Sequence, residues 1–138
     1  MTPERLDISS FSKAVGRLEE GLSEYQAHPG NDIYRDGLIQ RFEFTYELSH
    51  KMLRRHLEMT SPSPVIYADM NFQDIIRTAN EQGLLLGEWP DWKQYREKRA
   101  KTSHTYDEEV ALDVVDIIPK FLREVRFLRE KLIERGHG

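Results

Sequence analysis

Apolar residues recur every three or four positions along the chain, and this spacing constrains the fold more than any other feature. In the first stripe the steps alternate strictly between three and four, a heptad rhythm that suits one face of an α-helix and that a β-strand cannot use. The stripe consists of Ile8, Phe11, Val15, Leu18, Leu22 and Tyr25. Because His28-Pro29-Gly30-Asn31 is a strong helix breaker, we expect this helix to end near Ala27.

A second, longer stripe predicts a helix of roughly 28 residues, or about 40 Å. Its members are Leu38, Phe42, Thr45 or Tyr46, Ser49, Leu53 and Leu57. It stops at Ser61-Pro62-Ser63-Pro64, whose prolines cannot continue a helix.

The rest of the chain continues in the same period. Two short helices are expected, one with Phe72, Ile75, Ile76 and Ala79 and closed by Gly83, and one with Trp92, Tyr95 and Arg99 on a shared face. The last long stripe is Val110, Val114, Ile117 or Ile118, Phe121, Val125, Leu128 and Leu132. Pro119 falls inside this stripe, so we expect a kink there.

These periods predict an all-α fold, because alternation of Val and Ile over four or more residues is absent. We expect an up-and-down antiparallel helical bundle of the four-helix type, with three long helices and one or two short ones. The 138 residues suit one domain, which we assign to residues 1–138. The heptad spacing of the first helix serves an intramolecular bundle or a dimer seam equally well.

Composition excludes several function classes. The absence of cysteine removes disulfides, thiolate zinc sites and a cysteine nucleophile. The longest apolar run, Val65 to Ala68, is far too short to span a membrane. Charged residues stand where a signal peptide needs an apolar stretch, so we expect a cytoplasmic protein. A formal net charge of −4 argues against a general nucleic-acid coating protein but leaves room for a local basic site.

Such a basic segment runs from Lys93 to Lys101, with five basic residues against one acid. Beyond it, Thr105 and Glu108 have the form of a capping box, which predicts Thr105 as the N-cap of the last long helix. His104 would then lie just outside a helix N-terminus, where unpaired N–H groups and the helix dipole bind phosphate. Arg99 is five residues earlier, at the end of the preceding short helix.

An arginine and a histidine at such a place suit phosphoryl chemistry. A neutral imidazole can take the proton of a ribose 2′-hydroxyl, and a guanidinium can stabilise the charged transition state by bidentate hydrogen bonds. This chemistry requires neither a metal ion nor a cofactor. On spacing alone, an interfacial or surface histidine beside a helix cap is the more frequent explanation.

A resemblance to a known family changes that balance. The run Arg99-Ala100-Lys101-Thr102-Ser103-His104-Thr105-Tyr106 resembles the R-x4-H-x-Y signature of the HEPN superfamily. It is most similar to the HepT-like branch, whose members are called nucleotidyltransferase substrate-binding proteins. The run from Gln40 to Leu48 resembles the RFEFTYEL helix of that branch. The match extends over roughly residues 5 to 130, and the matching segments follow one another in the same order as in the family.

The resemblance implies a helical bundle that forms a homodimer and pairs with a minimal nucleotidyltransferase in a toxin–antitoxin system. The toxin of such a pair is a metal-independent endoribonuclease, and the antitoxin can transfer AMP to the tyrosine of the motif. Residue by residue, Arg99 and His104 match the catalytic pair, and Tyr106 matches the modifiable tyrosine. Supporting or phosphate-binding roles are expected for Lys101, Thr102, Ser103, Thr105, Arg41, Glu43 and Glu47.

Two positions depart from the family pattern. Ala100 replaces a residue that is usually polar, and Ser49-His50 stands where the branch commonly has a small residue followed by Trp. Ala100 keeps a second interpretation open, in which the chain is a non-catalytic substrate-binding or adaptor subunit of a nucleotidyltransferase. A third interpretation is a plain helical scaffold dimer.

The long second helix carries two further patterns. Glu43 and Glu47 are four residues apart and share a face, so together with Arg41 they are candidates to support the signature, for instance by an ion pair to Arg99. A solvated charged face is the alternative. Glu47-Leu48-Ser49-His50 has the Glu-x-x-His form of di-iron bundles, but a second copy is missing, so we expect no metal site.

Overall fold

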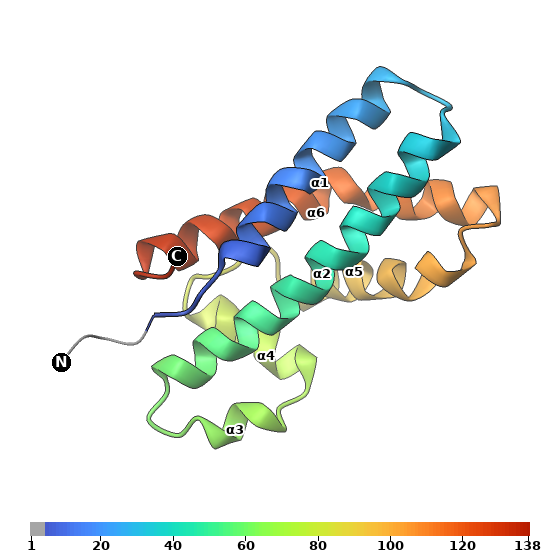
Figure 1. Ribbon diagram of the computed structural model, residues 1–138. Coiled ribbons are helices and arrows are strands. Elements are labelled where there is room, and N and C mark those ends of the chain that lie inside the picture. Colours follow the sequence, from blue (N-terminus) through green and yellow to red (C-terminus); the bar gives the residue numbers. More distant parts are fainter. Residues whose placement is uncertain (1–4) are drawn as a thin grey trace.

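Two pairs of antiparallel helices build the bundle in the computed structural model, which describes residues 5–138 (Figure 1). Helices α1 (Ser9–Ala27) and α2 (Asp32–Thr60) form one pair, and α5 (Trp89–Lys101) and α6 (Glu108–Glu134) form the other. Both α1 and α2 contact α6. The short helices α3 (Val65–Ala68) and α4 (Phe72–Glu81) connect the pairs, and the 3₁₀ helix η1 (Thr102–His104) leads from α5 into α6. The predicted all-α, up-and-down bundle is confirmed.

The predicted stripes form the core between the helix pairs. Phe11, Val15 and Leu18 of α1 are buried, as are the stripe residues of α2 and most of those of α6. An aromatic cluster occupies the centre, where the ring of Phe121 lies 5.0 Å from Phe42 and 5.1 Å from Tyr95 between centroids. Trp92 and Tyr95 are fully buried in this cluster, so α5 is held firmly on its inner face. Arg99 lies one turn beyond Tyr95 on the same helix.

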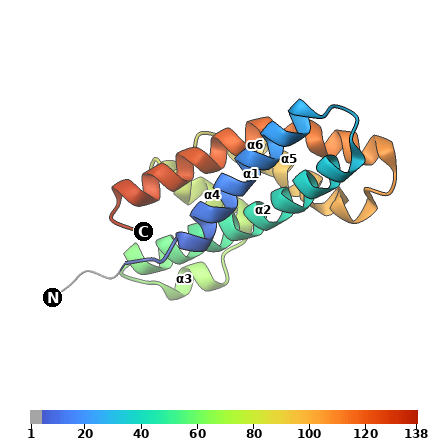
Figure 2. The ribbon, with the colours of Figure 1, turned by 45° about the horizontal axis from the view of Figure 1, so that its top comes forward.

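The turn between α1 and α2 follows from its sequence. Helix α1 ends at Ala27 as expected, and Gly30 adopts a positive φ of 81°, which glycine tolerates. The side chain of Asn31 then accepts hydrogen bonds from the N–H groups of Ile33 and Tyr34, at 2.9 and 3.1 Å, and so caps α2. Figure 2 shows this turn at the end of the bundle opposite the two termini.

The buried carboxylate of Glu124 fixes the segment that leads into α5. It accepts hydrogen bonds from the backbone N–H groups of Leu86 and Gly87, both at 2.7 Å. Burial raises the pKa of this carboxyl. A Cβ at Gly87 would lie only 2.7–2.9 Å from atoms of Asp91 and Glu124, so the close approach requires glycine. Glu124 thereby sets where α5 begins, and hence where its last turn places Arg99.

Two features differ from the sequence-based expectation. Helix α3 was not predicted, and it forms from the apolar run Val65–Ala68 directly after Pro64. The last helix begins at Glu108, with Asp107 rather than Thr105 as its N-cap. The Asp107 carboxylate accepts from the N–H groups of Glu109 and Val110, at 2.9 and 3.4 Å. Asp caps helices as well as Thr does, and the Thr105 hydroxyl instead donates to the Thr102 carbonyl at 3.3 Å.

Helix α6 runs as one element through Pro119. Across residues 5–138, the structure contains no helix with the length and apolar character needed to cross a membrane.

Candidate functional site

The guanidinium of Arg99 lies between the end of α5 and the middle of α2. Its Nη1 donates to the Thr102 hydroxyl oxygen at 2.9 Å, and its Nη2 donates to the Glu47 carboxylate. Glu43 completes the group, with its Oε2 3.8 Å from the same Nη2. The predicted ion pair between Arg99 and these two glutamates is confirmed. The Arg99 side chain remains 30% exposed, so the anchored guanidinium is still within reach of a ligand.

Local structure explains why these groups meet. Glu43 and Glu47 are one turn apart on α2, so their carboxylates lie side by side facing the end of α5. Thr102 is buried at the start of η1, where its hydroxyl also donates to the Arg99 carbonyl oxygen at 2.7 Å. Arg99 Nε is buried and has no hydrogen-bond partner within the described part of the chain. The arginine is therefore oriented by side chains from α2 and η1.

His104 and Tyr106 lie at the C-terminal end of the signature, and both side chains are exposed. His104 ends η1, and Tyr106 follows in the turn before α6, with 86% of its surface accessible. The two rings are 6.1 Å apart between centroids and nearly perpendicular, at 77°. Within residues 5–138 no hydrogen bond joins His104 to Arg99. The imidazole and the phenol hydroxyl are thus both accessible to a substrate or a modifying enzyme.

The expected phosphate site at the start of α6 is wrong in its details. His104 does not border the helix N-terminus, because Thr105, Tyr106 and the N-cap Asp107 intervene. The Asp107 carboxylate already accepts from two N–H groups of the first turn, and Glu108 and Glu109 add negative charge there. A helix end occupied by carboxylates repels a phosphate. The N–H groups of this helix end therefore do not form the expected phosphate site, and the nearest anchored cation of the signature is Arg99.

The lysines of α5 are partly engaged with α6. Lys98 and Lys101 bind the two oxygens of Asp113, at 2.7 and 3.0 Å. These hydrogen bonds hold the pKa of the Asp113 carboxyl below its usual value. Lys101, a predicted phosphate ligand, is half exposed and uses one of its three N–H donors on Asp113. Ser103 is exposed beside it, and Thr105 is half-buried.

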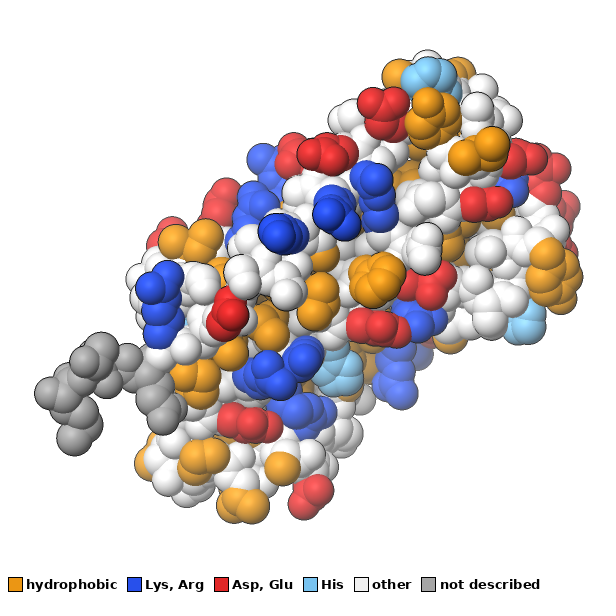
Figure 3. Space-filling model, in the orientation of Figure 1, with side chains coloured by type: hydrophobic (Ala, Val, Ile, Leu, Met, Phe, Trp, Pro, Cys, Tyr) orange, Lys and Arg blue, Asp and Glu red, His pale blue; other side chains and the backbone are white. Residues whose placement is uncertain are grey.

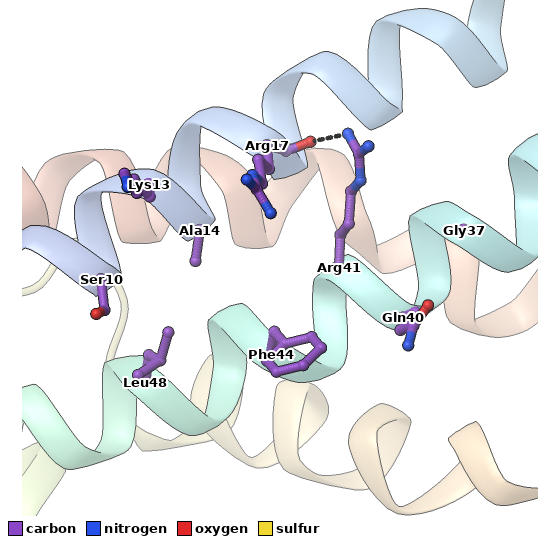
Figure 4. Close-up of a pocket in the computed structure, with 9 residues that line it drawn as sticks. All are labelled: Ser10, Lys13, Ala14, Arg17, Gly37, Gln40, Arg41, Phe44 and Leu48. Atoms are coloured by element: carbon purple, nitrogen blue, oxygen red, sulfur yellow. Dashed lines mark hydrogen bonds between the residues drawn. The ribbon is translucent and has the colours of Figure 1, made fainter.

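Arg41 does not belong to this cluster, contrary to expectation. It lies two residues before Glu43, a rotation of about 200° around an α-helix, and so points away from Arg99. Its Nη1 donates to the Arg17 carbonyl of α1 at 2.7 Å. Figure 4 shows Arg41 reaching across to α1, where it helps line a groove between α1 and α2. Its role is therefore separate from that of Glu43 and Glu47.

The Glu-x-x-His pattern splits between two environments. Glu47 binds Arg99, whereas the ring of His50 packs on Phe72 at 3.8 Å between centroids. Burial lowers the pKa of His50 to about 4, with further contributions from the charges of Arg54 and Arg96. Among residues 5–138 no three side chains of the metal-binding types come together.

Sequence reasoning missed the contacts of Lys98 and Lys101 with Asp113 and also an ion-pair cluster at the start of α2. Arg35 is almost fully buried and binds Asp32 at 3.3 Å and Asp36 at 3.2 Å on α2. It also lies 3.9 Å from a Glu108 oxygen, at the first residue of α6. Arg35 therefore ties the beginning of α2 to the beginning of α6, two residues after Tyr106. Locally, Arg35 stands three residues after Asp32 and directly before Asp36, but this pattern does not reveal the contact to Glu108.

Comparisons with known proteins agree with this picture. A family model described as "nucleotidyltransferase substrate binding protein like" matches residues 6–134. A protein of Haemophilus influenzae named probable ribonuclease HepT is 44% identical, over 99% of this chain and 98% of its own length. A solved structure from Haemophilus influenzae, described as the fold of a substrate-binding domain of a nucleotidyltransferase, has a TM-score of 0.84 at 36% identity, covering 91% of this chain and 98% of its own. A structure from Thermus thermophilus has a TM-score of 0.69 at 25% identity, covering 88% and 98%.

Proposed function

This chain belongs to the nucleotidyltransferase substrate binding protein-like family, and from that premise we propose that it is a metal-independent endoribonuclease toxin inhibited by a minimal nucleotidyltransferase partner. The observation that carries the proposal is the placement of an anchored guanidinium, Arg99, in the last turn of α5 and of an exposed imidazole, His104, at the end of η1, five residues later. The name of the Haemophilus influenzae relative supports the same activity.

In the proposed reaction, His104 removes the proton of a ribose 2′-hydroxyl. The 2′-oxygen then attacks the adjacent phosphorus, and the bond from phosphorus to the 5′-oxygen breaks, with a proton delivered to that leaving oxygen. The products are a 2′,3′-cyclic phosphate and a 5′-hydroxyl. Arg99 stabilises the added charge on the phosphorane-like transition state. We propose that a homodimer places two such pairs near one cleft, and that the protein acts in the cytoplasm.

The test is cleavage of RNA by the purified wild-type chain in the presence of a metal chelator. We expect cleavage that stops when the nucleotidyltransferase partner and ATP are added. Expression of the chain alone is expected to arrest growth, and co-expression of the partner to restore it. Binding to the partner without any RNA cleavage or growth arrest would contradict the ribonuclease assignment and support an adaptor subunit instead.

The adaptor function is a second candidate because one observation favours it. The Arg99 guanidinium is already paired with Glu47 and Glu43, and Ala100 supplies no polar group beside it. In an adaptor, these contacts would be structural and Tyr106 would be the functional group, presented to the nucleotidyltransferase. RNA cleavage separates the two functions, because only the first requires it.

Tyr106 is the proposed site of AMP transfer. Its hydroxyl oxygen would attack the α-phosphorus of ATP, releasing pyrophosphate and losing its proton, and its 86% exposure allows this. We expect incubation with the partner and ATP to add AMP to the wild type and to reduce RNA cleavage, because the new negative charge near His104 repels an RNA backbone. Intact-mass measurement checks the adduct.

The control for this prediction is Tyr34→Phe, which removes the hydroxyl of a half-buried tyrosine outside the motif and should leave the adduct unchanged. Tyr106→Phe should carry no AMP. An equal adduct on Tyr106→Phe, or none on the wild type, would rule out this modification.

A further inference from the structure

A groove on the outer side of the α1–α2 pair has no part in the proposed catalytic site. Figure 4 shows it from outside, with α5 and α6 passing behind. Its volume is about 510 Å³. The lining residues are Ser10, Lys13, Ala14 and Arg17 of α1, and Gly37, Gln40, Arg41, Phe44 and Leu48 of α2.

The groove has the shape that accepts a helix. Small side chains at Ala14 and Gly37 keep it open, and Phe44 and Leu48 lie one turn apart along its wall. The Arg41 side chain, which reaches across to α1, closes one end of the groove, and a second groove of about 210 Å³ lined by Glu24 and Ile33 lies beyond it. From Gly37 to Leu48 the lining residues of α2 extend over about 16 Å, or roughly three helical turns. Phe44 is 58% exposed, a large apolar side chain that the core does not use.

All the charged residues that line the groove are basic. Its nine lining residues include Lys13, Arg17 and Arg41 and no acid, although the chain as a whole has a net charge of −4. These three cations form no ion pair within the described residues. Figure 3 shows the same face, with basic side chains gathered over α1 beside apolar ones. An occupant that complements this surface is apolar on one side and acidic along its flanks.

Two other occupants fit less well. A second copy of the chain, docked through the same face, would bring the same cations opposite one another across a two-fold axis. An RNA strand running from the groove to Arg99 would have to cross Glu43 and Glu47, which stand on the α2 surface between Arg41 and Arg99. Like charges at those positions oppose a continuous phosphate track.

We propose that this groove docks an amphipathic helix of the nucleotidyltransferase partner, with apolar residues against Phe44 and Leu48 and acidic residues facing Lys13 and Arg17. The proposal rests on the partnership given under the proposed function. It separates two tasks on the molecule, because docking occurs on the α1–α2 face while RNA cleavage and AMP transfer occur at the junction of α5 and α6. The partner could then remain bound while its active site reaches Tyr106.

The test measures the affinity of the full-length chain for the partner by titration calorimetry. We expect Phe44→Ala to weaken binding about tenfold, and Lys13→Glu with Arg17→Glu to weaken it at least as much. Leu86→Ala is the matched control for Phe44→Ala, because both side chains are 58% exposed. Lys51→Glu with Arg55→Glu is the charge control, since both residues are exposed on α2 outside the groove. Both controls should bind within about twofold of wild type.

A photo-crosslinking residue in place of Phe44 identifies the occupant. We expect the linked partner peptide to carry acidic and apolar residues at helical spacing. If both groove variants bind the partner with wild-type affinity, the groove is not the docking site, although the partnership itself stands. No binding by the wild type would overturn the partnership and the groove together. Loss of RNA binding, or a change of oligomeric state, with partner affinity retained would assign the groove to RNA or to a second copy and overturn the proposal.

Discussion

His104→Ala is expected to abolish RNA cleavage, lowering the rate at least about 10²-fold, the lower end of what general acid–base catalysis contributes. The imidazole is exposed at the end of η1 and packs only loosely against Tyr106, so its removal leaves the core unchanged. The helical circular dichroism signal and the unfolding temperature should match the wild type. His28→Ala is the control, because His28 is likewise exposed but lies in the turn between α1 and α2.

Arg99 requires a more careful substitution than His104. Arg99→Ala would leave Glu43 and Glu47 without their cation and so mix a structural effect with a catalytic one. Arg99→Lys keeps a positive charge for the glutamates but loses the planar donors that bind a phosphate in bidentate fashion. We therefore expect Arg99→Lys to fold normally and to cleave RNA much more slowly. Wild-type cleavage rates in His104→Ala and Arg99→Lys would contradict the catalytic assignment of both residues.

The long helices α1, α2 and α6 were predictable because each buries a continuous stripe, and burial selects the helical period whatever the neighbouring elements are. The four-residue helix α3 buries only Tyr67 and was missed. The ion pair of Glu47 with Arg99 was predictable only in part. The i,i+4 spacing placed Glu43 and Glu47 on one face, whereas the position of Arg99 opposite them depends on how α5 packs across α2. The family resemblance supplied that link before the structure did.

The start of α6 was mispredicted because two good N-cap residues, Thr105 and Asp107, stand two positions apart. A capping-box pattern cannot show that η1 uses the Thr105 hydroxyl, which leaves Asp107 to cap the helix. Arg41 was misassigned for a related reason. Its neighbours in the motif point toward α5, but a shift of two residues places a side chain on the opposite face of a helix. A short motif therefore identifies which residue types are present, but it does not show toward which neighbouring helix each side chain points.

A chain of hydrogen bonds at the other end of the bundle fixes two buried histidines in their neutral forms. The Leu6 N–H donates to His137 Nδ1 at 3.1 Å, so that nitrogen carries no proton. Neutral His137 then carries its proton on Nε2 and donates it to His56 Nδ1 at 2.8 Å. Protonating either ring places a hydrogen on an accepting nitrogen and breaks one of these bonds. The two backbone hydrogen bonds that link Gly138 to Leu6 and Ile8 belong to the same contact.

The protein is therefore expected to lose stability as the pH falls from about 6.5 to about 4. Burial lowers the pKa of His56 from 6.5 to about 4, helped by His137 and Arg135, and burial also lowers the pKa of His137. Between these values the unfolded chain binds more protons than the folded one, so the free energy of unfolding decreases with decreasing pH. The loss from His56 is on the order of 3 kcal/mol, and His50 titrates in the same direction. Glu124, whose pKa is raised, acts in the opposite sense.

Urea unfolding at a series of pH values measures this dependence. His56→Phe removes one titrating group while keeping a buried ring, and we expect its stability to vary less with pH between 6.5 and 4 than that of the wild type. Its absolute stability at neutral pH should be lower, because His137 Nε2 loses its acceptor and becomes a buried unsatisfied donor. An identical slope in His56→Phe would show that the acid sensitivity arises elsewhere in the chain and not in this histidine pair.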